Sequence, residues 1–258
     1  MSNTVKKTVL ITRAEELQQG IYSMCIEDKQ MAESAKPGQF VSLYCMDGSR
    51  LLPRPISICE IDREKGTLRL VYRVVGKGTE EFSKLHAGAR ISVLGPVGNG
   101  FTIEGTKALL IGGGIGIPPM LELAKTLASK NIEVQVVLGY RDVLFLNQEF
   151  EAYGKVYIST EDGSYGTKGN VIDAIRENGL EGDIIYSCGP TPMLKGVKAY
   201  GLEHQITTQL SLEERMACGV GACLGCVCKT TEKNPQTQVN NKRICKDGPV
   251  FYAQEVEL

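Results

Sequence analysis

The sequence has almost no net charge and no long apolar run. Its 29 Lys and Arg residues nearly balance 30 Asp and Glu residues, for a formal net charge of −1. This charge gives no electrostatic reason to expect nucleic acid or an anionic membrane surface as a partner. No apolar stretch approaches the roughly 20 residues that a membrane-spanning helix needs. The chain begins MSNTVKKTVLITR, which lacks the apolar core of a secretory signal. We therefore expect a cytoplasmic protein.

Histidine is scarce, and the sequence has no internal repeat or low-complexity segment. The two histidines, His86 and His204, belong to no motif, so we assign neither of them a catalytic role. Hydrophobic residues make up 42% and charged residues 23% of the chain, which is ordinary for a globular protein. With 258 residues the chain is long enough for more than one compact domain.

Residues 1–102 read as a series of short strands. Segments such as 39–46, 67–75 and 90–95 are rich in β-branched and aromatic residues, which favour strands. Turn dipeptides such as Pro37-Gly38 separate them. Roughly six strands with few helices between them predict an antiparallel β-barrel.

Residues 103–205 show a different pattern, in which strands alternate with helices. The apolar run 107–114 is followed by apolar residues at helical spacing. Further strand-like segments cover 133–140, 155–160 and 183–189. Such alternation predicts a parallel sheet covered by helices, in a Rossmann-like α/β domain. The whole chain is thus expected to combine α+β and α/β domains.

The third region, 206–258, is rich in cysteine and glycine and shows little periodicity. We expect a small domain organised by a metal centre, because so short a region cannot bury a large core alone. In a reducing compartment, clustered cysteines are more often metal ligands than disulfides. Four cysteines follow the plant-type C-x4-C-x2-C…C spacing for a [2Fe–2S] cluster: Cys218, Cys223, Cys226 and Cys245.

Two alternatives to this ligand set stay open. A closed zinc site with four thiolate ligands also uses closely spaced cysteines, although the x4 spacing with a third cysteine nearby favours a cluster. The fifth cysteine of the region, Cys228, departs from the expected spacing, and we treat it as a bystander. It would become a ligand only in place of Cys226 or Cys245.

A glycine-rich turn follows the strand-like run 107–114. Glycines there let the backbone approach a pyrophosphate, whose charge meets free N–H groups at the start of the next helix. The pattern G-x-G-x-x-P departs from the complete dinucleotide fingerprint, so an ordinary tight turn is the alternative. The glycines that we expect to contact the nucleotide are Gly112, Gly113, Gly114 and Gly116.

A second turn, Cys188-Gly189-Pro190, follows the strand-like segment 183–189. Together with the glycine-rich turn it resembles the ferredoxin–NADP reductase superfamily, in which a flavin-binding barrel precedes a nucleotide-binding domain. The resemblance implies that the Cys-Gly-Pro segment lies beside the nicotinamide. Alone, Cys188 reads as a buried core thiol. In this pair of motifs we expect it to pack against the reacting rings and not to act as a nucleophile.

The segment Arg54-Pro55-Ile56-Ser57 resembles the Arg-x-Tyr-Ser flavin signature of that superfamily, with Ile56 in place of the tyrosine. An arginine here suits FAD phosphate oxygens through charge-assisted hydrogen bonds, and a donor at Ser57 suits the reactive edge of the flavin. The turn 76–79 reads as a backbone nest for the pyrophosphate. A surface turn and a solvated arginine are the alternative. The resemblance implies five further FAD contacts: Val71, Tyr72, Arg73, Gly78 and Thr79.

Three segments, 54–57, 111–120 and 210–229, together narrow the resemblance. They look like the electron-transfer subunits of class 1B dihydroorotate dehydrogenase, over essentially the whole chain. The cysteine segment discriminates most, because many flavin reductases share the other two motifs. The resemblance implies FAD, one [2Fe–2S] cluster and NAD(H) in this chain. It also implies a separate FMN-containing catalytic subunit, in a heterotetramer with two copies of each subunit.

In that family electrons pass from the partner's FMN through [2Fe–2S] and FAD to NAD+, in a step of pyrimidine biosynthesis. The catalytic subunit oxidises dihydroorotate to orotate, so we expect no acid–base residue in this chain. Preference for NAD follows from the resemblance; a carboxylate at Glu161 or Asp162 would repel a 2′-phosphate. An apolar surface around residues 223–226 is the expected docking site.

Two other functions fit parts of the sequence. An NAD(P)H-dependent iron–sulfur flavin reductase for another acceptor, such as ferredoxin, would use the same first two domains. A zinc-stabilised nucleotide-binding adaptor would use the glycines and the cysteines, but it gives the segment 54–57 no role.

Overall fold

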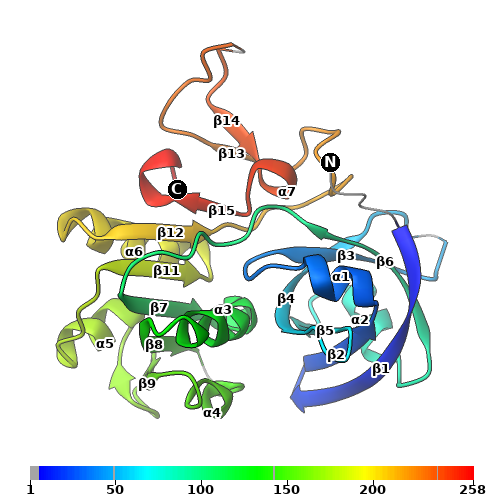
Figure 1. The fold of residues 1–258 in the computed structure, drawn as a ribbon, viewed down its shortest axis with the longest axis horizontal. Coiled ribbons are helices and arrows are strands. Elements are labelled where there is room, and N and C mark those ends of the chain that lie inside the picture. Colours follow the sequence, from blue (N-terminus) through cyan, green and yellow to red (C-terminus); the bar gives the residue numbers. More distant parts are fainter. Residues whose placement is uncertain (1–5, 49, 142, 237) are drawn as a thin grey trace.

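A computed structural model describes residues 6–48, 50–141, 143–236 and 238–258 of the chain (Figure 1). It contains a closed barrel, a seven-stranded sheet flanked by helices, and a two-stranded sheet near the C-terminus. In Figure 1 the barrel (blue to cyan) lies beside the larger sheet (green to yellow), and the cysteine-rich region (orange to red) lies above them. The expected fold class is confirmed. In the described ranges, no helix is both long and apolar enough to cross a membrane.

Six antiparallel strands close the barrel in the order β1-β2-β5-β4-β3-β6. Side chains alternate between its two faces, as the pleat of a strand requires. On β3, Val41 and Leu43 are fully buried in the barrel core, whereas Phe40 packs outside it against the cysteine-rich region. The bounds are β1 Lys6–Gln18, β2 Ile21–Glu27, β3 Phe40–Tyr44, β4 Arg54–Asp62, β5 Thr67–Arg73 and β6 Arg90–Val97.

Two short helices interrupt the barrel strands. Helix α1 (Lys29–Ser34) begins at Asp28, whose carboxylate accepts a hydrogen bond from the backbone N–H of Met31, a common helix start. Helix α2 (Lys77–Ser83) begins in the turn that follows β5. Neither helix is long enough for its apolar spacing to stand out in the sequence.

The larger sheet has the order β10-β9-β8-β7-β11-β12-β15. Its strands β9, β8, β7, β11 and β12 are parallel, and β15 is antiparallel to β12. Successive strands run outward in one direction from β7 and in the other from β11, so the chain reverses its course between these two strands. The bounds are β7 Lys107–Gly113, β8 Glu133–Tyr140, β9 Lys155–Thr160, β10 Thr167–Lys168, β11 Ile184–Cys188, β12 Thr207–Ser211 and β15 Val250–Tyr252.

Helices cover both faces of this sheet, and α3 also contacts the barrel. Met120, Leu123 and Leu127 of α3 are fully buried in one hydrophobic cluster with barrel residues such as Cys59 and Val71. The flavin and nucleotide parts therefore share a continuous core. The helices are η1 Gly114–Gly116, α3 Pro118–Ser129, α4 Asn147–Phe150, α5 Val171–Glu177 and α6 Thr191–Glu203.

The cysteine-rich region is built from short elements: β13 Val227–Lys229, β14 Asn241–Arg243, α7 Ile244–Asp247 and η2 Ala253–Glu255. Strands β12 and β15 follow residue 206 in the sequence, yet they extend the nucleotide sheet. The backbone N–H of Asn99, after the last barrel strand, donates to the carbonyl of Gly248. The region is thus attached to both neighbours, and the limits 1–102, 103–205 and 206–258 stay a prediction.

Candidate functional site

The two turns expected to bind the nucleotide lie side by side. Strands β7 and β11 are parallel neighbours, with Gly112 opposite Cys188. A Cβ atom built on Gly116 would lie 2.5 Å from the carbonyl oxygen of Cys188 and 2.5 Å from the amide nitrogen of Gly189. Only glycine allows this approach. Both turns therefore open at the carboxyl ends of the strands where the chain reverses its course, which is the general position of ligands in open α/β sheets.

Further glycines keep this edge of the sheet free of side chains. A Cβ on Gly113 or on Gly189 would collide with Met193 of α6. The glycine-rich turn continues through η1 into α3, which has proline in its first turn. Proline costs little there, since its missing N–H would have no helical partner. These features fit the backbone cradle that a pyrophosphate requires.

Cys188 is suited to packing and not to nucleophilic attack. Its side chain is 1% exposed, and burial, together with the charge of Glu213, raises the pKa of the thiol to about 12. The thiolate is the reactive form of cysteine, so this thiol stays neutral and unreactive near neutral pH. The role expected for Cys188 beside the nicotinamide remains a prediction.

The two carboxylates that are candidates for repelling a 2′-phosphate directly follow β9. Glu161 is exposed. Asp162 accepts a hydrogen bond from the backbone N–H of Ser164, 2.9 Å away, and this bond lowers the pKa of Asp162. Asp162 therefore supports its own turn, which leaves Glu161 as the better candidate for repelling a 2′-phosphate.

The flavin motif places Arg54 against the start of α2. Arg54 is the first residue of β4, and its Nη1 donates to the carbonyl of Leu52 at 2.5 Å. A Cβ built on Gly78 would lie 2.5 Å from Nε of Arg54. Glycine at position 78 thus leaves room for the guanidinium group. The result is a cationic fork beside a glycine turn, which fits the phosphates of FAD.

The hydroxyl of Thr79 organises this turn from within. Its Oγ1 accepts hydrogen bonds from the backbone N–H groups of Val75 (2.9 Å) and Gly76 (3.2 Å) and donates to the carbonyl of Gly76 (3.0 Å). Thr79 is buried. Its hydroxyl is therefore occupied in holding the turn, and its expected contact with FAD stays a prediction.

The three residues expected to contact FAD at the end of β5 lie in different surroundings, and their FAD contacts stay predictions. Tyr72 is 3% exposed. Its ring stacks on that of Tyr22, with 6.1 Å between the ring centroids, and meets the ring of Phe82 edge-on, with 6.3 Å between the centroids. This ring is therefore part of the barrel core. Val71 packs toward the nucleotide part, and Arg73 is exposed. Strand β5 contacts η1, so this side of the barrel lies against the glycine-rich turn.

The cysteine ligands expected for the cluster form two pairs. The sulfur atoms of Cys218 and Cys223 are 3.3 Å apart, and the thiols of Cys226 and Cys245 share a side-chain hydrogen bond. Within the described ranges, no group of three or more His, Cys, Asp or Glu side chains gathers around one point that would hold a single metal ion. Two pairs of thiols fit a two-iron cluster better than one tetrahedral zinc ion.

Backbone N–H groups point at these sulfur atoms. Gly221 donates to Sγ of Cys245 at 3.1 Å, and Cys223 and Val220 donate to Sγ of Cys218 at 3.4 and 3.5 Å. The turn that aims them has glycine at φ +80° at position 221, a conformation that favours glycine. Such donors are the usual surroundings of iron–sulfur clusters.

The same donors change the acidity of the thiols. Burial alone would raise the pKa of Cys218, but hydrogen bonds from the backbone of Cys223 and Val220 lower it to about 6. For Cys245, burial and the neighbouring Cys226 raise the pKa to about 12. Cysteine binds metal as the thiolate. The donors around Cys218 therefore favour its ligand form.

Cys228 lies outside both pairs. It belongs to β13, where its thiol contacts the carbonyl oxygen of Lys242 on β14 at 3.6 Å, and burial raises its pKa. Its Sγ is thus directed at the neighbouring strand. The choice of Cys226 and Cys245 over Cys228 as ligands stays a prediction that this placement supports.

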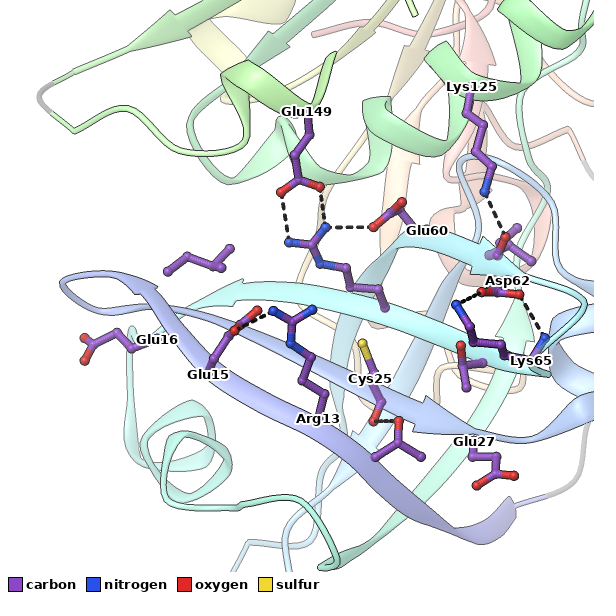
Figure 2. Close-up of a pocket in the computed structure, with 15 residues that line it drawn as sticks. Arg13, Glu15, Glu16, Cys25, Glu27, Glu60, Asp62, Lys65, Lys125 and Glu149 are labelled. Atoms are coloured by element: carbon purple, nitrogen blue, oxygen red, sulfur yellow. Dashed lines mark hydrogen bonds and ion pairs between the residues drawn. The ribbon is translucent and has the colours of Figure 1, made fainter. Parts of the chain in front are cut away.

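A groove between the barrel and the nucleotide part was not expected from the sequence. Its volume is about 940 Å³, and no residue of the flavin or nucleotide motifs lines it. Dashed lines in Figure 2 join the carboxylates of Glu149 of α4 and Glu60 of β4 to the same guanidinium group. Arg69 of β5 lies between them and donates to Glu60 at 2.7 Å and to Glu149 at 2.5 Å. Arg69 and Glu149 are 80 positions apart along the chain, so no local sequence motif predicts their ion pair.

Comparison with known proteins identifies matching families and structures. Residues 213–257 match the family described as the iron–sulfur cluster binding domain of dihydroorotate dehydrogenase B. Residues 110–199 match the oxidoreductase NAD-binding domain. The dihydroorotate dehydrogenase B (NAD(+)) electron transfer subunit of Geobacillus thermodenitrificans is 44% identical, over 92% of this chain and 93% of that protein. The same subunit of Bacillus cereus strain G9842 is 41% identical, over 98% and 99%.

Solved structures match the fold of the chain over most of its length. The NADH-dependent reduced ferredoxin–NADP oxidoreductase, studied for flavin-based electron bifurcation, is 30% identical with a TM-score of 0.87, over 100% of this chain and 91% of that chain. The ferredoxin reductase of carbazole 1,9a-dioxygenase is 22% identical with a TM-score of 0.68, over 78% and 66%, which shows the fold alone. The expected cofactor set of FAD, [2Fe–2S] and NAD(H) is confirmed at the level of the whole chain. The chain belongs to the family of electron-transfer subunits of NAD-dependent dihydroorotate dehydrogenase B.

Proposed function

We propose that this chain carries electrons from the FMN of a separate catalytic subunit, through [2Fe–2S] and FAD, to NAD+ while that subunit oxidises dihydroorotate to orotate. One observation carries the proposal: the barrel that holds the flavin motif contacts both the cysteine loop (residues 218–226) and the nucleotide turn. On one side, Gly219 of the cysteine loop packs against Ser42 of β3, which pairs with Pro55 of β4. On the other side, β5 contacts η1.

This order of sites is what a relay needs. Each carrier has to lie next to the one that it exchanges electrons with, and the protein's task is to hold them in place. When bound, FAD supplies the step that links one-electron exchange with the cluster to hydride exchange with the nicotinamide. The chain's own residues have binding roles: Arg54 holds the phosphates, Ser57 meets the flavin, and the glycines of the two turns admit NAD(H).

The proposal gives no residue of this chain an acid–base role. Dihydroorotate chemistry belongs to the catalytic subunit. The proposal includes an FMN in that subunit and a heterotetramer with two copies of each subunit. It also includes the cytoplasmic location. A flavin reductase for another acceptor would need the same three sites, and only the partner distinguishes it.

The cluster loop is the proposed docking site for the catalytic subunit. Leu224, between two expected ligands, is 70% exposed. Val227 is only half-buried in the adjoining strand β13. Val220 of the same loop is 47% exposed, so the loop presents apolar surface of the kind that marks a partner site. We expect Leu224→Ala to weaken assembly and to spare NADH oxidation by an artificial dye. Full assembly of this variant would exclude the loop as the docking site.

The experiment that tests the function combines composition with activity. The chain is purified without oxygen, its iron, sulfide, flavin and zinc are measured, and NAD+-dependent dihydroorotate oxidation is assayed with and without a co-expressed FMN-containing subunit. We expect FAD, about two irons and two sulfides per chain, and activity only in the complex. FAD and cluster without that activity would indicate another partner. Zinc without flavin would overturn the redox function.

A further inference from the structure

Ser42 is a buried serine whose hydroxyl has no hydrogen-bond partner within the described residues. It is 1% exposed, and its Oγ finds no donor or acceptor. Ser42 lies on β3 between Val41 and Leu43, which face the barrel core, so its side chain points to the outer face. A buried polar group without a partner is costly, and it calls for a partner that the protein alone does not provide.

The outer face at Ser42 is covered by the cysteine loop. A Cβ atom built on Gly219 would lie 2.9 Å from Oγ of Ser42, and Gly219 has φ +68°. Phe40, on the same face of β3, packs in one hydrophobic cluster with Cys226 and Cys245. The unpaired hydroxyl thus lies against the loop that follows Cys218, on the side where the expected ligands gather.

We propose that Ser42 is a positioning residue of the [2Fe–2S] site, whose hydroxyl donates a hydrogen bond to an inorganic sulfide of the cluster. This inference rests on the proposed cluster. Cluster and cysteine sulfurs accept several weak hydrogen bonds, which help to set the reduction potential. The added negative charge of the reduced state is stabilised by a donor, so the hydroxyl raises the potential.

The position of Ser42 gives this hydrogen bond a second consequence. Ser42 pairs in register with Pro55 of the flavin motif on β4, while its hydroxyl lies against the cluster loop. One residue of β3 therefore joins the loop that holds the cluster to the strand that begins with Arg54. A hydrogen bond at this point fixes the cluster loop to the flavin barrel.

The test is a potentiometric titration of the cluster by electron paramagnetic resonance, in the FAD-containing chain. Ser42→Ala is compared with wild type and with Ser42→Thr, which keeps the hydroxyl. Ser159→Ala is the matched control, because Ser159 Oγ is also buried and unpaired among the described residues, but lies on β9 of the nucleotide sheet. We expect Ser42→Ala to lower the reduction potential of the cluster. The reduction equilibrium should shift by up to tenfold, which corresponds to about 59 mV for one electron. Ser42→Thr and Ser159→Ala are expected to match wild type.

Several results would overturn the inference. An unchanged cluster potential in Ser42→Ala would do so, and so would equal shifts in both alanine variants or a shift confined to the flavin. If Ser42→Ala assembles too little cluster to titrate, resonance Raman of the assembled fraction still reports the Fe–S stretching frequencies. These are expected to rise when a hydrogen bond to sulfur is lost, and wild-type frequencies would count against Ser42. Wild-type protein without iron and sulfide would instead refute the proposed function.

Discussion

The carboxylate of Glu122 on α3 accepts a hydrogen bond from the backbone N–H of Ile61 on β4, at 2.8 Å. Glu122 is 2% exposed. Glu122 and Ile61 are 61 positions apart in the chain. Their bond joins the nucleotide part to β4, the barrel strand that begins with the flavin motif. Burial raises the pKa of Glu122 from its ordinary value of 4.5, and the Ile61 N–H only partly opposes this.

The raised pKa of Glu122 predicts a pH-dependent stability. The folded protein holds this proton more tightly than the unfolded chain does, so the contribution of Glu122 to stability is lost as pH rises from 4.5 through the raised pKa. Glu122→Gln stays neutral and keeps an acceptor for Ile61. We expect the free energy of unfolding of Glu122→Gln, relative to that of wild type, to increase as pH rises through this window. Above the window the difference between the two proteins is expected to stay constant.

The measurement for Glu122 is urea unfolding across a series of pH values. Glu64→Gln, which changes an exposed carboxylate in the turn after β4, is the control and is expected to parallel wild type. Glu122→Ala removes the acceptor. Its free energy of unfolding is expected to be about 1–3 kcal/mol lower than that of wild type, because the Ile61 N–H is left buried and unpaired. Parallel curves for wild type and Glu122→Gln at every pH would show that the carboxylate is not protonated preferentially in the fold.

Gly78 is predicted to control FAD affinity through Arg54. A Cβ at position 78 would collide with the guanidinium group, whereas a Cβ on Gly48 would meet no atom of the described residues within 4 Å. We expect Gly78→Ala and Arg54→Ala to weaken FAD binding about 10- to 100-fold, since charge-assisted hydrogen bonds contribute about 1.5–3 kcal/mol. Flavin content and FAD titration of the apoprotein measure this. Gly48→Ala is the control, and equal affinities of Gly78→Ala and Gly48→Ala would argue against the Arg54 fork.

Gly116 is predicted to keep the two nucleotide turns in contact. A methyl group there would meet the Cys188–Gly189 peptide, whereas a Cβ on Gly196 of α6 would have only Ile172 near it, at 3.8 Å. Gly116→Ala is therefore expected to weaken NADH binding at least tenfold and to leave the flavin content unchanged. Gly196→Ala is the control. The readouts are the KM for NADH with an artificial electron acceptor and the bound flavin. A wild-type KM for NADH in Gly116→Ala would show that the turn does not bind the nucleotide.

The two cysteines that compete for the fourth ligand position have opposite predicted effects. Cys245 pairs with Cys226 and accepts a hydrogen bond from Gly221, while the thiol of Cys228 contacts β14. We expect Cys245→Ser to lose most of the iron and sulfide and Cys228→Ser to keep both, with FAD retained in each variant. Iron, sulfide and visible spectra provide the measurement. The reverse result would make Cys228 a ligand.

The local motifs of this chain were readable because each depends on residue types at fixed spacing. The glycines of the turn 112–116 predict a backbone cradle. The segment 54–57 predicts a cationic fork, and the cysteine spacing predicts thiolate ligands. The Rossmann-like alternation and the six barrel strands were also visible, since each strand carries enough β-branched residues to show a period.

Other features depend on contacts that no local pattern encodes. Strands β12 and β15 have five and three residues, too few to show a period beside cysteines and glycines. The ring of Tyr72 turns into the barrel because Tyr22 and Phe82 receive it there. The hydrogen bond of Glu122 to Ile61, like the unpaired hydroxyl of Ser42, becomes visible only when strands distant in the sequence are adjacent.

The most direct test of the relay is reduction of the isolated, anaerobic chain by NADH, followed by electron paramagnetic resonance of the cluster. In wild type, we expect NADH to produce the signal of the reduced [2Fe–2S] cluster. In Arg54→Ala depleted of FAD but retaining its cluster, we expect no signal with NADH and a full signal with dithionite. Cluster reduction by NADH without FAD would contradict the proposed order of sites, as would a wild-type chain with all cofactors whose cluster NADH leaves oxidised while dithionite reduces it.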